Sequence, residues 1–268
     1  MIVKLSTLLL TLVGCFLMSA ALGADSLRVV STKFCGNLNS TCSRKIDVIY
    51  LKKGHFLVSA MNSSGAIAKP EDDRENLDSL LGVAAKTQAL AVFSVGFYRD
   101  PWITRQTGGF KTSNIVVSKE VDLPQSSFIC FNSGSLTISR SSSAFSKSPN
   151  CIQVKPTIYE SGRSSDDLRL EAGRGYFPPQ YFKNSFGIFV ASFKNGDAAV
   201  IVAHEHSYSE VQSFVKEFPL EGGEVSIVVG VSGGPFAGAI VRTPTTPIVI
   251  GEIRAGVPYT ILVSSEQH

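Results

Sequence analysis

The chain has 268 residues, of which 44% are hydrophobic and 18% are charged, and its formal net charge at pH 7 is +3. This length and composition are sufficient for a sizeable core. The 25 basic and 22 acidic residues nearly balance and form no basic stripe, so the charge pattern gives no indication of a nucleic-acid-binding protein.

Residues 1–23 are predicted to form a secretory signal peptide. Lys4 precedes a long apolar run that ends in small residues, which is typical of a cleavable leader. A lipoprotein signal at Cys15 is the alternative, but apolar residues rather than a polar tether follow that cysteine. No later apolar run approaches membrane-spanning length, so we expect a secreted, extracellular, monomeric protein without membrane contacts.

Beyond the leader, apolar runs of strand length alternate with segments rich in Gly, Ser, Asn and Pro. Helical periodicity is weak, and only residues 75–86 and 209–217 are helix candidates. The pattern predicts an all-β protein, either a sandwich or a barrel. The predicted strands include residues 46–51, 56–60, 89–95, 115–117, 186–191, 198–203, 225–229 and 248–253.

The mature chain contains four cysteines, and the predicted oxidising compartment makes disulfides their expected fate. Two asparagines, Asn39 and Asn62, each begin a sequon for N-glycosylation. The four cysteines are Cys35, Cys42, Cys130 and Cys151.

Several segments resemble, in order, motifs of trypsin-like serine proteases. Residues 56–63 (FLVSAMNS) resemble the strand that delivers the catalytic histidine, with Asn62 at the histidine position. Asp100 lies where the family places its buried aspartate. Residues 230–235 (GVSGGP) resemble the nucleophile loop, with Ser232 as the serine. An alternative register would instead leave Ala203 at the serine position.

The resemblance implies a fold of two six-stranded antiparallel β-barrels within one trypsin-like domain, residues 29–268. The first barrel would span about residues 29–128 and be shortened. The second would span about 129–268 and lack the closing helix of the family. Residues 24–28 would form a short propeptide-like segment, removed by cleavage after Arg28.

The resemblance also implies a disulfide. The segment CFNSG that begins at Cys130 resembles the opening of the second barrel, and Cys151 follows 21 residues later, as in small trypsins. The family pattern then pairs Cys35 with Cys151. The pairing of Cys42 and Cys130 remains open.

The implied catalytic site is degenerate. Asn62 cannot accept a proton near neutral pH, and Val231 replaces the acid that pairs with the freed N-terminus in the family. We therefore predict a proteolytically inactive homologue without cofactors. It would act by binding secreted proteases or inhibitors, as an adaptor, cofactor or decoy. A weakly active secreted endopeptidase is the alternative, with Ser232 as its nucleophile.

Two further features suggest other activities. His204, His206 and Glu210 are similar to the first metal motif of cupins, because two histidines at this spacing point to one face of a strand. A cupin-like metal-binding protein is therefore a further alternative, although no metal site is expected. Residues 176–182 contain four aromatic residues, which either anchor a partner or cover the core.

Overall fold

The computed structural model describes residues 27–34, 44–62, 78–95, 98–100, 103–106, 108–119, 126–132, 134–172, 186–234, 237–243, 246–254, 256–257 and 259–265. Within these ranges the chain is mostly antiparallel sheet with four short helices, which confirms the all-β prediction. The strands are β1 (Leu27–Lys33), β2 (Lys45–Leu51), β3 (Phe56–Asn62), β4 (Ala91–Val95), β5 (Tyr98–Asp100), β6 (Ile103–Gln106), β7 (Phe110–Thr112), β8 (Ile115–Ser118), β9 (Ser127–Asn132), β10 (Ser135–Ser139), β11 (Asn150–Val154), β12 (Thr157–Glu160), β13 (Phe186–Phe193), β14 (Ala198–His204), β15 (Val225–Gly234), β16 (Gly238–Val241), β17 (Ile248–Gly251) and β18 (Tyr259–Ser265). The helices are α2 (Leu80–Thr87), α3 (Ser143–Lys147), α4 (Ser165–Ala172) and α5 (Tyr208–Glu217).

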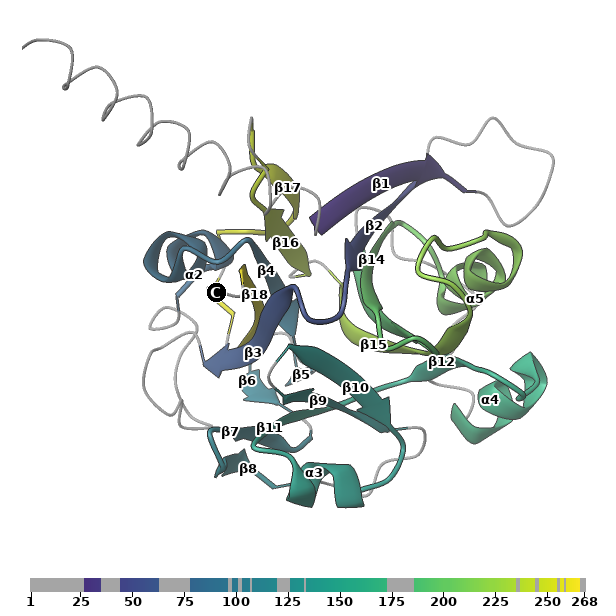
Figure 1. The fold of residues 1–268 in the computed structure, drawn as a ribbon, viewed down its shortest axis with the longest axis horizontal. Coiled ribbons are helices and arrows are strands. Elements are labelled where there is room, and N and C mark those ends of the chain that lie inside the picture. The colour runs from purple at the N-terminus through teal and green to yellow at the C-terminus, as the bar shows by residue number, and fades with distance from the viewer. Residues whose placement is uncertain are drawn as a thin grey trace, which may run out of the picture.

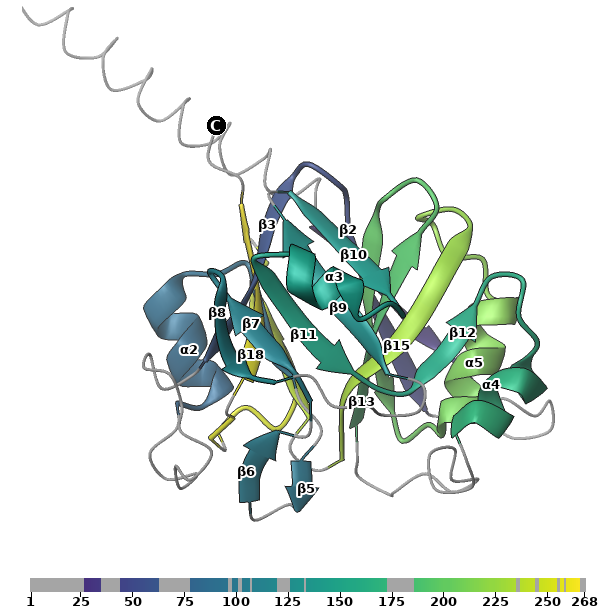
Figure 2. The ribbon, with the colours of Figure 1, turned by 90° about the horizontal axis from the view of Figure 1, so that it is seen from below.

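Three sheets surround a common interior (Figure 1). Sheet A has the strand order β1-β2-β14-β13-β15-β12, sheet B the order β17-β16-β4-β18-β3, and sheet C the order β10-β9-β11-β7-β8. Strands β5 and β6 form a separate two-stranded ribbon. Figure 2 shows this ribbon projecting beyond the ends of the larger sheets.

The inward face of each sheet contributes to one core. Alternate residues of a strand point to opposite faces, so every second apolar residue faces the interior. Ile49 and Val200 of sheet A, Phe93 of sheet B, and Phe131 and Ile152 of sheet C belong to this single cluster. None of the five is more than 1% exposed. The described strands therefore form one structural unit.

A helix covers the outward face of each sheet (Figures 1 and 2). Phe214 of α5 packs on sheet A, Leu80 of α2 on sheet B, and Phe145 of α3 on sheet C. Among the described helices, none is long and apolar enough to span a membrane.

Capping residues explain where the two predicted helices begin. Helix α5 starts with a capping box, in which the Ser207 side chain and the Glu210 side chain satisfy each other's backbone N–H groups. Helix α2 starts at Ser79, whose Oγ accepts a hydrogen bond from the Gly82 N–H at 3.1 Å. Both helices overlap the segments predicted from periodicity, whereas α3 and α4 were not predicted.

The two predicted barrels are not seen among the described strands. Each of the three large sheets combines strands from before and after residue 128. Ile49 of β2, for example, is the register partner of Val200 of β14. These strands therefore form hydrogen bonds between the two predicted halves of the chain as well as within each half. The result is three sheets that share one core, not two closed six-stranded barrels.

Candidate functional site

At one end of the core, polar residues occupy inward positions of sheet A. Ile49 and Leu51 of β2 face the common core, and strand alternation places Asp47 on the same face. The Asp47 side chain is completely buried. A buried carboxylate is unfavourable unless it is paired and hydrogen-bonded, so its partners are the natural starting point for a functional site.

Asp47 has three side-chain partners, one on its own strand and one on each neighbouring strand. Its Oδ2 lies 2.7 Å from Nε2 of His204 on β14, and its Oδ1 lies 2.8 Å from Nζ of Lys45. Ser31 of β1, the register partner of Asp47, donates a hydrogen bond to Oδ1. Both carboxylate oxygens are therefore occupied.

Two opposing effects determine the pKa of Asp47. Burial is the largest single effect and raises this pKa, because it disfavours the charged form. Hydrogen bonds from His204, Lys45 and Ser31 favour the carboxylate and together outweigh burial. The pKa of Asp47 consequently lies below its ordinary value, and the residue is an anion at neutral pH.

His204 connects this buried anion to the surface. Its side chain is 24% exposed, and its ring forms a T-shaped contact with the Phe186 ring at a centroid distance of 5.0 Å. A neutral imidazole that donates from Nε2 to Asp47 keeps a lone pair on Nδ1. In that tautomer the nitrogen can accept a hydrogen bond from a ligand hydroxyl.

Ser232, the predicted nucleophile, lies at the same end of the core but is buried. It is 3% exposed, and its Oγ accepts a hydrogen bond from Oγ of Ser94 at 3.2 Å. The Ser94 Oγ in turn accepts from the Gly238 N–H at 3.0 Å. The pair joins β15 of sheet A to β4 of sheet B. This hydroxyl is thus part of a buried network rather than an accessible nucleophile.

The segment GVSGGP does not form the predicted loop over residues 230–234. These residues are the end of β15, and the pairing register with β13 shifts between Ile188 and Phe189. Val231 lies at this irregularity and is fully buried. A β-bulge of this kind accounts for the small residues that resembled a nucleophile loop.

The other two triad positions lie on different strands. Asn62 ends β3, and β18 separates β3 from the Ser94 strand β4. Two strand spacings correspond to roughly 10 Å. Asp100 ends β5, which pairs with β6 in the small ribbon. The side chains of Asn62 and Asp100 lie outside the described part of the chain, so the assembly of these three positions stays a prediction.

The cupin-like arrangement of His204 and His206 is wrong, because the two rings lie on opposite sides of sheet A. Glu205 adopts a left-handed conformation with φ of 57°, which ends the strand alternation. Nε2 of His206 is 2.9 Å from the Phe34 carbonyl, on the outer face. Glu210 pairs with Arg44 at 2.5 Å. The described residues contain no group of three potential metal ligands.

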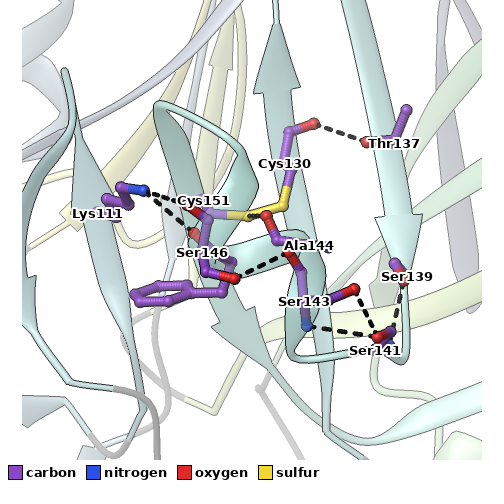
Figure 3. Close-up of a disulfide and its surroundings, with 10 residues drawn as sticks. Lys111, Cys130, Thr137, Ser139, Ser141, Ser143, Ala144, Ser146 and Cys151 are labelled. Atoms are coloured by element: carbon purple, nitrogen blue, oxygen red, sulfur yellow. Dashed lines mark hydrogen bonds between the residues drawn. A yellow bond between two sulfur atoms is a disulfide. The ribbon is translucent and has the colours of Figure 1, made fainter.

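The predicted Cys35–Cys151 disulfide is also wrong. Cys151 of β11 is bonded to Cys130 of β9, its direct register partner in sheet C (Figure 3). Both cysteines occupy outward positions beneath α3, in the cluster that contains Phe145. The separation of 21 residues therefore reflects two paired strands that bring the two thiols face to face.

Cys35 and Cys42 lie outside the described residues. The described residues on either side are close, because the Phe34 N–H donates to the Arg44 carbonyl at 3.3 Å. Because Cys130 is bonded to Cys151, the pairing of Cys42 with Cys130, which the resemblance left open, is excluded.

Some of the remaining predicted positions lie within the described residues and others lie outside them. Arg28 lies within β1 and pairs with Glu221 at 2.7 Å, so the expected cleavage point is inside a strand. Asn39, the leader, and the aromatic run 176–182 lie outside the described residues, as does the side chain of Asn62.

Sequence reasoning missed Asp47 and its partners. The available signal was a single carboxylate within an apolar strand, Ile46-Asp47-Val48, at the alternation position of Ile49. A polar residue at an inward position is rarely accidental, because its burial must be compensated. His204 was noticed, but with His206 as its partner rather than Asp47.

Comparison with known proteins identifies only the fold. No family model and no curated protein sequence matches the chain. The zebrafish N-acetylglucosamine-1-phosphodiester alpha-N-acetylglucosaminidase catalytic domain, auto-inhibited by its pro-peptide, superposes with a TM-score of 0.65 at 11% identity, over 90% of this chain and 84% of that one. A hypothetical protein from Synechocystis superposes with a TM-score of 0.60 at 9% identity, over 90% of this chain and 62% of that one. At these identities the chain is similar to both in fold, and no residue role is transferred.

Proposed function

We propose that this chain is an exported protein that binds a sugar-linked phosphodiester at the Asp47–His204 end of the core without hydrolysing it. The fold likeness to a glycosidase acting on N-acetylglucosamine-1-phosphodiesters supports the ligand class. The side chains at this end support binding rather than turnover.

The observation that carries the proposal is the state of Asp47. Glycosidases commonly use two carboxyl groups, one to protonate the leaving group and one to act as nucleophile or base. Asp47 is the only fully buried carboxylate among the described residues, and His204, Lys45 and Ser31 occupy both of its oxygens. A carboxylate committed in this way supports a fixed binding site better than acid–base chemistry on a sugar.

The surrounding groups suit a sugar phosphate. Asp47 holds His204 so that Nδ1 can accept a hydrogen bond from a sugar hydroxyl. The partly exposed Phe186 ring beside it offers an apolar surface for the sugar ring. Lys45, whose side chain is 44% exposed, supplies a positive charge for a phosphate.

Export remains part of the proposal. The predicted leader implies an oxidising compartment, and the Cys130–Cys151 bond is of the kind that persists there. The role predicted from the protease resemblance, an adaptor for secreted proteases or inhibitors, stays a prediction and can be tested by affinity capture with the mature chain.

The test combines a thermal shift with a product assay, using N-acetylglucosamine-1-(methyl phosphate). Binding at about 100 times Kd should stabilise the protein by about 2.7 kcal/mol, which raises Tm by several degrees, with no release of N-acetylglucosamine. His204→Ala should abolish the shift. The matched control is His55→Ala, because His55 is an exposed histidine elsewhere.

Two results would overturn the proposal. An unchanged Tm at millimolar ligand would show that the protein does not bind this class of ligand. Release of N-acetylglucosamine that disappears in His204→Ala would instead make His204 a general base, and the protein a hydrolase.

A further inference from the structure

A second lysine lies beside the Asp47–His204 site, at the end of the edge strand β1 of sheet A. Lys33 is the register partner of Lys45, directly across from it on β2. Two positions before Lys33, the Ser31 hydroxyl donates to the Asp47 carboxylate, and alternate residues of a strand point to the same face. Lys33 therefore lies on the same face of the sheet as Lys45 and Asp47.

The two lysines share a single acid. Lys45 is paired with Asp47, whose two carboxylate oxygens are already occupied. Within the described part of the chain, the exposed Lys33 ammonium has no acidic partner and no hydrogen-bond acceptor. Glu210 is paired with Arg44 on the outer side of the sheet. The side chains of Lys33, Lys45 and Asp47 together carry one net positive charge.

This arrangement of like charges suits an anion bound between them. Residues directly opposite on two antiparallel strands have Cβ atoms about 5 Å apart, and like charges at such a pair repel. An anion between the Lys33 and Lys45 ammonium groups removes that repulsion. Each ammonium has three donors, so Lys45 can keep its bond to Asp47 and still donate to a ligand. A phosphodiester carries one negative charge shared by two non-bridging oxygens, which matches two ammonium groups.

The strand order places the lysine pair next to the groups proposed to hold the sugar. Strands β13, β14, β2 and β1 are successive neighbours in sheet A (Figure 1). Phe186 and His204 are register partners on the first two, and Lys45 and Lys33 on the last two. Asp47 contacts both His204 and Lys45, so the two pairs lie at the same end of the sheet. With strands about 4.8 Å apart, a sugar over β13 and β14 has its phosphate within reach of lysine side chains on β2 and β1.

We propose that Lys33 and Lys45 form the phosphate subsite of this site, with one ammonium group at each non-bridging oxygen of the phosphodiester. This inference rests on the proposed function, which supplies the ligand class and uses Lys45 as its only cation. Lys33 adds the charge that the site otherwise lacks, because Asp47 already neutralises Lys45. Lys33 is therefore the residue that favours an anionic ligand over a neutral one.

The experiment is calorimetric titration of the full chain with N-acetylglucosamine-1-(methyl phosphate). Lys33→Gln removes the charge but keeps a hydrogen-bond donor, and should weaken binding about tenfold, as expected when a hydrogen bond between charged groups is lost. Lys33→Arg keeps the charge and should bind within about twofold of the unmodified chain. Without ligand, the Tm of Lys33→Gln should be unchanged or slightly higher, since one of two repelling charges is gone. A residue that only supported the fold would lower the Tm instead.

Lys52→Gln is the matched control, because Lys52 is an exposed lysine just beyond the opposite end of β2, about 24 Å from Lys45 along the strand. It removes the same formal charge and should leave binding within about twofold. Two results would overturn this inference alone: binding that depends on His204 but is weakened no more by Lys33→Gln than by Lys52→Gln, or an equal loss in Lys33→Arg and Lys33→Gln. Absence of any binding that depends on His204 would overturn the proposed function and this inference together.

Discussion

His204 and His206 are two residues apart, yet they lie on opposite sides of one sheet and in opposite environments. His204 is on the inner side, where its Nε2 meets the buried Asp47 carboxylate. His206 is on the outer side, where its Nε2 meets the Phe34 carbonyl and its Nδ1 is buried without a hydrogen-bond partner in the described part of the chain. The positive φ of Glu205 between them causes the difference.

This comparison shows that backbone conformation, not residue type, decides what each imidazole can do. Burial lowers the pKa of His206 below its ordinary value, and the nearby Arg44 lowers it further. The Phe34 carbonyl and Glu210 oppose this shift only partly. His206 is therefore a neutral packing residue, whereas the partly exposed His204 is held through Nε2 by the buried Asp47 carboxylate.

The largest expected effect comes from removing the anion on the inner side. Asp47→Ala removes a buried carboxylate that accepts hydrogen bonds from His204, Lys45 and Ser31, while the partly exposed Lys45 and His204 side chains can turn to solvent, so it should lower the free energy of unfolding by about 1–3 kcal/mol. Urea denaturation measures this loss. The control is Glu224→Ala, which breaks an exposed ion pair with Lys194 and should change stability by less than about 1 kcal/mol. Equal losses in the two variants would mean that the buried network is unimportant.

A smaller effect on stability is expected at the start of α5, the helix that covers the outer face of sheet A. Ser207→Ala removes the capping hydroxyl that accepts from the Glu210 N–H at 3.3 Å. The loss should be about 1 kcal/mol, as for other N-cap substitutions. Ser213→Ala, within the same helix, should be neutral or slightly stabilising because alanine favours helix. A neutral Ser207→Ala would show that packing alone fixes the helix start.

The strands could be predicted from sequence, and their partners could not. Apolar runs such as Ile46–Leu51 are long enough to indicate strands, and these fall in sheet positions. Pairing depends on contacts between distant segments, such as β2 with β14, for which a local pattern carries no information. The resemblance to protease motifs therefore predicted the wrong pairing of strands.

Prediction of the candidate site from sequence met the same limit. Gly-Val-Ser-Gly-Gly predicted a nucleophile loop, but these small residues serve a strand irregularity at Val231. His204 was recognised as a candidate because its spacing to His206 and Glu210 resembled a metal motif. Asp47 could be recognised only once the inward face of β2 was known, because an isolated carboxylate in a strand has no motif.

Glu205 itself offers a test of what separates the two histidines. Its φ of 57° is unfavourable for a residue with a Cβ atom. Glu205→Gly should be about 1 kcal/mol more stable than Glu205→Ala, since both lose the side chain and only glycine relieves the backbone. Comparing the two variants by urea denaturation isolates the effect of the backbone conformation at this position on the free energy of unfolding. Equal stabilities would show that the turn tolerates a side chain without strain.

The smallest effect is the pH dependence of the outer histidine. The unfolded chain binds a proton at His206 near its ordinary pKa of 6.5, whereas the folded chain, with a lower pKa, does not. Between these two values the unfolded state carries more protons, so stability is complete above pH 6.5 and falls as the pH is lowered below it.

Asp47 affects stability in a separate pH range. Its folded pKa lies below its ordinary value of 3.8, so its contribution is present above that pH and is lost only in stronger acid. Urea midpoints at pH 7.5 and pH 5.0 therefore report on His206 and not on Asp47. In His206→Gln, which keeps a donor for the Phe34 carbonyl, the decrease in midpoint should be smaller than in the unmodified chain. An identical decrease in both proteins would place the titrating group elsewhere and remove the proposed contrast between the two histidines.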